Sequence, residues 1–216
     1  MSFEKVNPPR NVRWSKLLCS VNVSESQANQ AFLEIEQAYQ QPERYYHNLT
    51  HLDDMFQVVD QLAQSSVSPA LLLAIWYHDV VYDSKKNDNE EQSASLAESR
   101  LRQWDLDQAI LDETIRLILL TKVHHAEPKD HEGHILLDAD LAILSSEADR
   151  YHQYSQAIRK EYSWVSDAEY RAGRSKVLQR FLERDSLYFT AKFQADREEQ
   201  ARRNLAHELD QLASIE

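Results

Sequence analysis

Residues 71–83, LLLAIWYHDVVYD, contain the feature that decides the fold. The stretch begins as an apolar run and ends with His78 and Asp79 side by side, before Val80 and Val81. Burying an imidazole and a carboxylate costs free energy unless a partner satisfies their polarity. A hydrogen-bonded pair inside a core would do so, and a divalent metal ion would bind both groups at once. The stretch therefore predicts a helical core segment that carries a candidate metal site.

The composition favours an all-α, single-domain protein. The chain has 216 residues, 42% hydrophobic and 28% charged, which is the balance of a globular protein that can bury a core. Only two glycines occur, whereas sheets and doubly wound folds need many more tight turns. The formal net charge of -12 disfavours a polymeric nucleic acid as partner, because such binding needs a basic face. It does not exclude a small phosphorylated substrate, since a local cation can oppose the overall field.

Cysteine content and hydropathy bear on the compartment. The single Cys19 excludes an internal disulfide and fits a reducing environment. The N-terminus has no apolar signal core, and the longest apolar run, residues 70–77, is too short to span a bilayer. We therefore expect a cytoplasmic protein without a membrane partner. Its oligomeric state is left open.

Helix signals recur along the chain. Pro8 and Pro9 predict an extended arm over residues 1–13, followed by one helical domain over 14–216. Capping signatures mark three helix starts: Ser24 with Gln27, Ser68 with Pro69, and Ser166 with Glu169. The expected helices cover about 14–21, 24–41, 44–64, 69 to the His78-Asp79 pair, 90–104, 106–121, 135–144, 166–184 and 193–212.

Two histidines open the third of these segments, RYYHNLTHLDDMFQVVDQLAQ. Its apolar residues recur at intervals of three and four, which is typical of an amphipathic helix. If the helix covers both His47 and His51, they share one face. Thr50 with Asp53 could instead mark the helix start and leave His47 on the entering turn. In either case the two imidazoles lie close together.

Two aspartates interrupt the apolar stretch ILLDADLAIL. Because Asp138 and Asp140 point in different directions on a helix, one of them is expected to meet a positive partner inside. With His51, His78 and Asp79, this carboxylate would complete a set of two imidazoles and two carboxylates. Such a set suits Mn²⁺, Mg²⁺, Fe²⁺ or Zn²⁺. Water on such an ion becomes a nucleophile near neutral pH, which is hydrolytic chemistry.

The order H…HD…D resembles the HD-domain superfamily of metal-dependent phosphohydrolases. The segments YYHNLTHLDDM, IWYHDVVYD, NEEQSA, LLDADLAIL, EYSWVSDAEYRAGRSKVLQRFL and ARRNL are similar to a bacterial subgroup of predicted HD phosphohydrolases, and they span most of the chain. The resemblance implies an HD-type helical bundle that hydrolyses a phosphoester or phosphoanhydride in a nucleotide or other small phosphorylated metabolite. It implies four ligands for the divalent metal ion: His51, His78, Asp79 and Asp140.

The segment YHNLTH also resembles the YHNxxH signature of cyclic-nucleotide phosphodiesterases, which share the HD architecture. In that family the first histidine protonates the leaving oxygen and the second binds metal. The resemblance thus implies that His47 is the general acid. The alternative is that His47 only holds a metal ligand in position. The chain lacks the additional histidine that those enzymes place shortly after their HD pair, so a cyclic-nucleotide substrate is not implied.

Acidic residues after the HD pair are further candidates for catalysis. Glu90 or Glu91 could orient the attacking water; the alternative is an acidic first turn favoured by the helix dipole. Lys122 and His125 are candidates to contact a phosphate. The connection 122–134 carries four histidines, which could complete a second metal site or belong to a solvated loop: His124, His125, His131 and His134.

A cationic cluster lies near the C-terminus, in the segment YRAGRSK. Arg171 and Arg174 could clamp a phosphate, or they could form ion pairs on a solvated face. Two other functions remain open. One is an HD-type di-iron oxygenase, which uses two further histidines between the HD pair and the last aspartate. The other is a non-catalytic sensor or scaffold that keeps the metal for stability.

Overall fold

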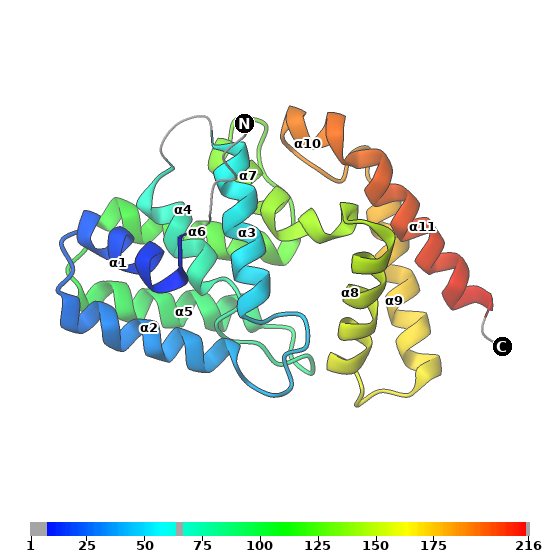
Figure 1. Ribbon diagram of the computed structural model, residues 1–216, viewed down its shortest axis with the longest axis horizontal. Coiled ribbons are helices and arrows are strands. Elements are labelled where there is room, and N and C mark those ends of the chain that lie inside the picture. The colour runs from blue at the N-terminus through cyan, green and yellow to red at the C-terminus, as the bar shows by residue number, and fades with distance from the viewer. Residues whose placement is uncertain (1–7, 64–66, 215–216) are drawn as a thin grey trace.

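The computed structural model describes residues 8–63 and 67–214 (Figure 1). Within these residues all regular structure is helical, with no strand, which confirms the all-α prediction. None of the described helices has the length and apolar character needed to cross a membrane. In chain order the elements are α1 (Arg10–Ser20), α2 (Glu25–Tyr39), α3 (Leu49–Leu62), α4 (Pro69–Tyr77), α5 (Asn89–Gln103), α6 (Gln108–Val123), α7 (His131–Asp140), the 3-10 helix η1 (Leu141–Ser145), α8 (Ala148–Glu161), α9 (Asp167–Leu182), α10 (Ala191–Asp196) and α11 (Glu198–Ser214).

Helix α4 is the centre of the N-terminal helices. Its sequence, PALLLAIWY, is apolar on every side, which is typical of a helix buried all round. It packs against α1, α3, α5, α6 and α7. Trp76 is fully buried and meets the ring of Trp14 edge-on, with ring centroids 5.3 Å apart. The segment that we expected to lie in the core therefore does so.

The two ends of α4 are fixed by side chains. At its start, the Ser68 hydroxyl accepts a hydrogen bond from the Leu71 amide at 3.1 Å, and Pro69 occupies the first turn. At its end, Arg44 donates to the Val80 carbonyl at 2.9 Å, and the Val81 amide donates to a serine hydroxyl of α5. Because these backbone groups are engaged elsewhere, the helix stops at Tyr77. The His78-Asp79 pair therefore lies just beyond the helix.

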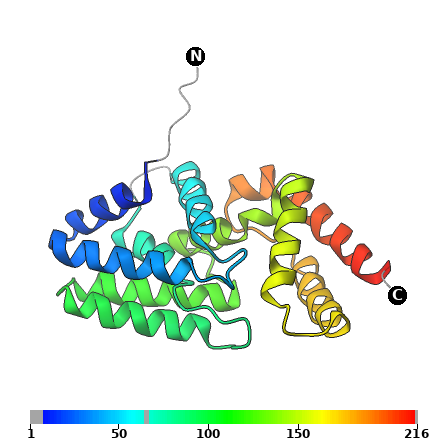
Figure 2. The same cartoon turned by 60° about the horizontal axis from the view of Figure 1, so that its bottom comes forward.

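The C-terminal helices α8, α9 and α11 lie beside this bundle, on the right in Figures 1 and 2. The chain reaches them through η1, and α11 packs against α8, α9, α10 and η1. Arg174 of α9 and Glu208 of α11 form a buried ion pair at 2.8 Å, and the Tyr151 hydroxyl of α8 donates to Glu208 at 2.6 Å. This polar network holds three C-terminal helices together.

Several helix boundaries differ from the predicted ones, among them the start of α3 at Leu49 rather than at residue 44. Helix α1 begins at Arg10 directly after Pro9, so residues 10–13 of the predicted arm are helical, and residues 1–7 lie outside the described part. Helix α7 begins at His131, within the expected loop, because the Asp130 carboxylate accepts from the Gly133 amide at 2.9 Å. The helix expected over 193–212 is two helices, α10 and α11. Helix α8 was not predicted.

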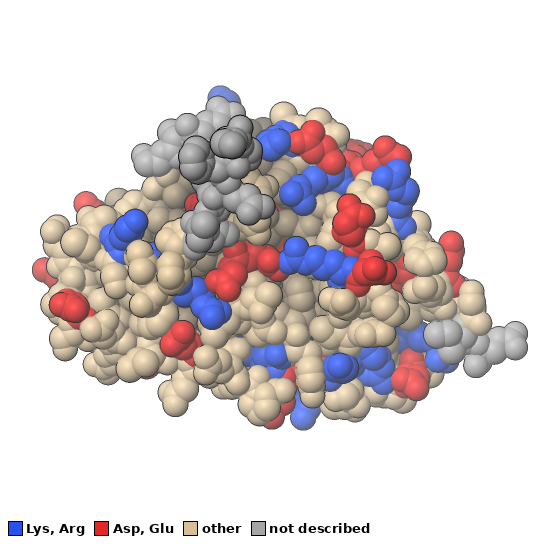
Figure 3. Space-filling view, in the orientation of Figure 1, with Lys and Arg blue, Asp and Glu red and all other residues tan. Residues whose placement is uncertain are grey.

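Charges of both signs cover the surface. On the face shown in Figure 3, Lys and Arg side chains are interspersed with Asp and Glu side chains, and no continuous basic area forms.

Candidate metal centre

Three separate segments bring histidine and aspartate side chains to one point. His51 lies in the first turn of α3, which begins where the Asn48 side chain accepts from the Thr50 amide at 2.8 Å. His78 and Asp79 follow the end of α4, and Asp140 ends α7. The four candidate ligands predicted from the sequence are therefore neighbours in the structure.

The ligand atoms are spaced as around a metal ion. The Nε2 atoms of His51 and His78 lie 3.2 Å apart, and His78 Nε2 lies 3.1 Å from Asp79 Oδ2. Asp140 Oδ1 lies 3.2 Å from His51 Nε2 and 3.9 Å from His78 Nε2. Neighbouring ligands on an ion with bonds of about 2.1 Å are about 3 Å apart. His51, His78 and Asp79 could therefore hold a metal ion, and the Asp140 carboxylate lies beside them.

The cluster carries strong negative charge. Burial alone would raise the pKa of Asp79, but the charge and hydrogen bond of His78 bring it well below its usual range. Burial alone would likewise raise the pKa of Asp140, but hydrogen bonds from His124 and His51 bring it far down. Burial acts to lower the pKa of His78, and Asp79 raises it to about 9. Both carboxylates are therefore ionised at neutral pH, which suits a cation.

Hydrogen bonds orient two of the candidate ligands. His78 Nδ1 donates to the Ile75 carbonyl at 2.9 Å, so its Nε2 faces the cluster. His124 Nε2 lies 2.9 Å from Asp140 Oδ2, on the carboxylate oxygen that does not face His51. His124 ends α6 in a left-handed conformation, with φ 46° and ψ 50°, and this turn brings its ring back to α7. Asp140 is thus held on both oxygens.

The two aspartates of α7 have different environments. Asp138 is fully buried and accepts hydrogen bonds from the Phe189 amide at 2.7 Å and from the Thr190 amide at 2.9 Å. The Thr190 hydroxyl donates to Asp138 as well, at 2.6 Å. Asp138 therefore fixes the start of α10. Asp140, rather than Asp138, belongs to the histidine cluster.

His47 lies on the turn before α3 and is held by a buried carboxylate from α8. Its Nδ1 lies 2.7 Å from Glu161 Oε2, and its ring stacks on Tyr82 with centroids 4.2 Å apart. Glu161 also accepts from the amides of Tyr46 and His47 and from the Tyr82 hydroxyl. Burial acts to lower the pKa of His47, but the hydrogen bond to Glu161 and the nearby carboxylates raise it. Glu161 was not among the predicted site residues, because α8 was not predicted.

Arg44 connects the His47 turn to the metal-ligand turn. Its guanidinium is buried and donates to three backbone carbonyls: those of His47 at 3.3 Å, Asp79 at 2.5 Å and Val80 at 2.9 Å. It also lies over the rings of Tyr39 and Tyr82. One side chain thus fixes the relative position of both turns.

A cavity of about 780 Å³ opens beside this cluster. Asp79, Asp140 and His47 lie in its wall, together with Glu90 and His124. The cavity is large enough for a small organic ligand. This cavity therefore exposes the predicted general acid and two of the four candidate metal ligands.

The remaining predicted residues fall into two groups. Lys122 and Arg174 line the cavity, but Lys122 pairs with Glu91, and Arg174 is bound by both oxygens of Glu208. Three predicted residues are not part of the cavity wall: Glu91, His125 and Arg171. His125 is exposed to solvent, because the left-handed turn at His124 directs the two neighbouring rings apart. The structure therefore brings His124, and not His125, to the site.

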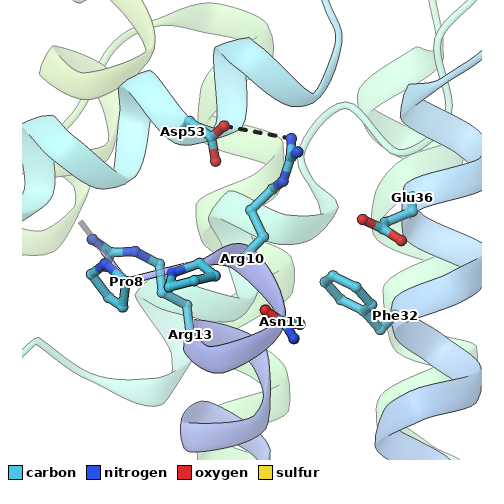
Figure 4. A pocket seen from close by; sticks show the side chains of 8 residues that line it. Pro8, Arg10, Asn11, Arg13, Phe32, Glu36 and Asp53 are labelled. Carbon is cyan, nitrogen blue, oxygen red and sulfur yellow. Dashed lines mark ion pairs between the residues drawn. The ribbon is translucent and has the colours of Figure 1, made fainter. Parts of the chain in front are cut away.

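A second cavity, of about 640 Å³, lies at the start of α1 (Figure 4). Arg10 reaches across it to Asp53 of α3, at 3.5 Å. Its wall shares no residue with the first cavity and contains no histidine. It offers no comparable set of ligands.

Comparison with known proteins found no matching family model, no matching curated protein and no matching solved structure.

Proposed function

We propose that this protein is a metal-dependent phosphohydrolase of the HD type, acting on a phosphoester or phosphoanhydride of a small phosphorylated metabolite. One observation carries the proposal. The imidazoles of His51 and His78 converge with the carboxylate of Asp79, and Asp79 lies in the wall of a cavity that also contains His47. The order and spacing of these residues, which resemble the HD superfamily, support the same assignment.

The residues of the chain have separate roles in the proposed reaction. His51, His78, Asp79 and Asp140 would hold the ion. When bound, the metal supplies a Lewis acid that polarises a phosphoryl oxygen and lowers the pKa of water. His47 protonates the leaving oxygen, because Glu161 binds its Nδ1 and this hydrogen bond acts to raise its pKa, which favours the protonated form. Its Nε2 is then free to donate into the cavity.

The structure favours hydrolysis over the two other functions. A di-iron oxygenase of this type needs two further histidines, and in the described part of the chain only His124 of the connecting loop contacts the cluster. His131 is exposed, and His134 pairs with the Glu127 carbonyl at 2.8 Å. A purely stabilising metal would need neither a cavity beside the ligands nor a histidine held by a buried glutamate.

Metal binding and turnover test the proposal together. The metal-free protein is assayed with Mn²⁺, Mg²⁺, Fe²⁺ or Zn²⁺ against a panel of phosphoesters. We expect activity with at least one ion, and we expect Asp79→Ala to lose both metal binding and turnover. Asp210→Ala, at an exposed position of α11, is the matched control and should retain both. Turnover by Asp79→Ala in metal-free buffer would refute the proposal.

A further inference from the structure

The cavity has a polar end and an apolar wall. The polar end contains the aspartates and His47 of the candidate metal centre. The remaining wall is formed largely by aromatic and aliphatic side chains of η1, α8, α9 and the α8–α9 turn, among them Ile143, Leu144, Tyr162, Trp164, Val177 and Phe181. Trp164 is 49% exposed and Val177 is 40% exposed, and both line the same cavity. Nothing in the described chain covers them.

Trp164 is held in place, although it is half exposed. Its indole nitrogen donates to the Ser84 hydroxyl at 2.9 Å, and that hydroxyl donates to the Glu161 carbonyl at 2.7 Å. Tyr162 lies nearly parallel to it, with ring centroids 6.3 Å apart and planes inclined by 30°. A ring fixed in this way loses little conformational freedom when a flat ligand stacks on it.

The cations of the cavity are mostly neutralised by protein carboxylates. Lys122 pairs with Glu91, and Arg174 donates two hydrogen bonds to Glu208, at 2.8 and 2.9 Å. Among the described cavity residues, Lys86 is the cationic side chain without a carboxylate partner. One cation besides the metal suits a single phosphate group. A triphosphate would add further charge beside Glu90 and Glu169.

We propose that the cavity takes a phosphomonoester whose alcohol part carries a flat ring system, with the phosphate at the His47–Asp79 end and the ring against Trp164, and that it disfavours triphosphates. This inference rests on the proposed function for its phosphate end. The ring subsite itself depends only on the apolar wall, so it can be tested separately.

Two matched ligand pairs test the ring subsite. Adenosine 5′-monophosphate and ribose 5-phosphate differ by the base alone, and adenosine and ribose repeat the comparison without a phosphate. We expect kcat/KM for adenosine 5′-monophosphate to exceed that for ribose 5-phosphate by about tenfold or more, the typical effect of one aromatic stack. ATP should be a poorer substrate than adenosine 5′-monophosphate. Adenosine should bind detectably by calorimetry, and ribose should not.

Substitution of Trp164 gives the decisive comparison. Trp164→Ala should reduce kcat/KM for adenosine 5′-monophosphate and the affinity for adenosine about tenfold, and reduce kcat/KM for ribose 5-phosphate much less, so that the preference between the two monophosphates falls. Trp164→Phe keeps a ring and should retain most of the preference. Leu33→Ala, at a 64% exposed position of α2, is the control and should change neither.

Each outcome has a distinct meaning. Equal rates for the two monophosphates, or a better rate for ATP, would overturn the proposed substrate class. If no phosphate compound is hydrolysed, the proposed function fails, and adenosine binding that depends on Trp164 still supports the ring subsite. Adenosine binding that is absent or unchanged by Trp164→Ala refutes it. A dimer that dissociates on Trp164→Ala would also refute it, since a second copy would then cover this wall.

Discussion

At the scale of single residues, the site depends on two buried charged groups that are not themselves candidate ligands, Glu161 and Arg44. Glu161 accepts four hydrogen bonds from His47, its amide, the Tyr46 amide and the Tyr82 hydroxyl. Arg44 donates to the carbonyls on both sides of the site. Buried charges are stable only when such hydrogen bonds satisfy them. The positions of His47 and Asp79 are therefore set by residues outside the ligand set.

Glu161→Gln should change the pH dependence of hydrolysis. Glu161 raises the pKa of His47, and the general acid must be protonated, so activity falls as the pH rises through that pKa. Without the carboxylate the pKa of His47 is lower, and the alkaline limb of the kcat/KM profile moves to lower pH. An alkaline limb that stays in place would show that His47 is not the acid.

The same pKa shift affects stability. Because the folded-state pKa of His47 lies above its unfolded value of about 6.5, the His47–Glu161 contact contributes fully below that value. The contribution is lost as the pH rises through the folded pKa. In urea unfolding between pH 6 and 9, the difference in free energy between the wild type and Glu161→Gln should shrink with rising pH. A difference independent of pH would contradict this linkage.

Arg44→Met should reduce both stability and metal affinity. The substitution removes the donors for the carbonyls of Asp79 and Val80 and leaves buried groups unpaired, at a cost of about 3 kcal/mol in the free energy of unfolding. The hydrogen bond that holds the backbone of Asp79 in place is also lost, so the dissociation constant of the metal should rise. Arg102→Met is the control, because Arg102 forms an exposed pair with Glu98 that is worth under about 0.5 kcal/mol. An Arg44→Met protein with unchanged metal affinity would exclude the anchoring role.

At the scale of helices, the sequence predicted those with clear local signals. Ser24, Ser68 and Ser166 cap α2, α4 and α9 as expected, because a cap depends on neighbours in the chain. Helix α8 has no such cap and few buried residues, so its packing against the C-terminal helices decides its formation. Because α8 was not predicted, the role of Glu161, which lies in α8, was not predicted either.

The candidate site was predictable in part for the same reason. His51, His78 and Asp79 lie at helix ends. The order of these three residues along the chain could be recognised from the sequence. His124 and His125 are adjacent, and only the left-handed backbone at His124 decides which ring reaches Asp140. That conformation depends on tertiary contacts. The ion pair between Arg174 and Glu208 joins residues 34 positions apart, which the sequence does not reveal.

Ser68→Ala tests the start of α4. It removes the acceptor for the Leu71 amide and a contact with Glu132 of α7, so the free energy of unfolding should fall by about 1–2 kcal/mol. Metal affinity should change little, because the His78-Asp79 pair follows the opposite end of α4. Ser99→Ala, exposed within α5, is the control and should be nearly neutral in urea unfolding. A stability loss no larger than in that control would contradict the capping role.

At the scale of the whole molecule, the N-terminal and C-terminal helices meet at the proposed reaction site. Helices α3, α4 and α7 supply the candidate ligands, whereas α8 and α9 supply Glu161 and much of the apolar wall. The net charge of -12 attracts cations to the protein as a whole. The ionised aspartates concentrate this attraction at the candidate metal centre. A bound ion would join three helices of the N-terminal bundle and stabilise the fold.

Metal content measured on the intact protein tests the central claim most directly. Elemental analysis after exhaustive dialysis against each of Mn²⁺, Mg²⁺, Fe²⁺ and Zn²⁺ is compared for the wild type, His78→Ala and the surface control Asp210→Ala. We expect at least one ion per chain in the wild type and in Asp210→Ala, and its loss from His78→Ala. The ion should raise the melting temperature of the wild type and of Asp210→Ala, and leave that of His78→Ala unchanged. Equal metal content in all three proteins would contradict the central claim.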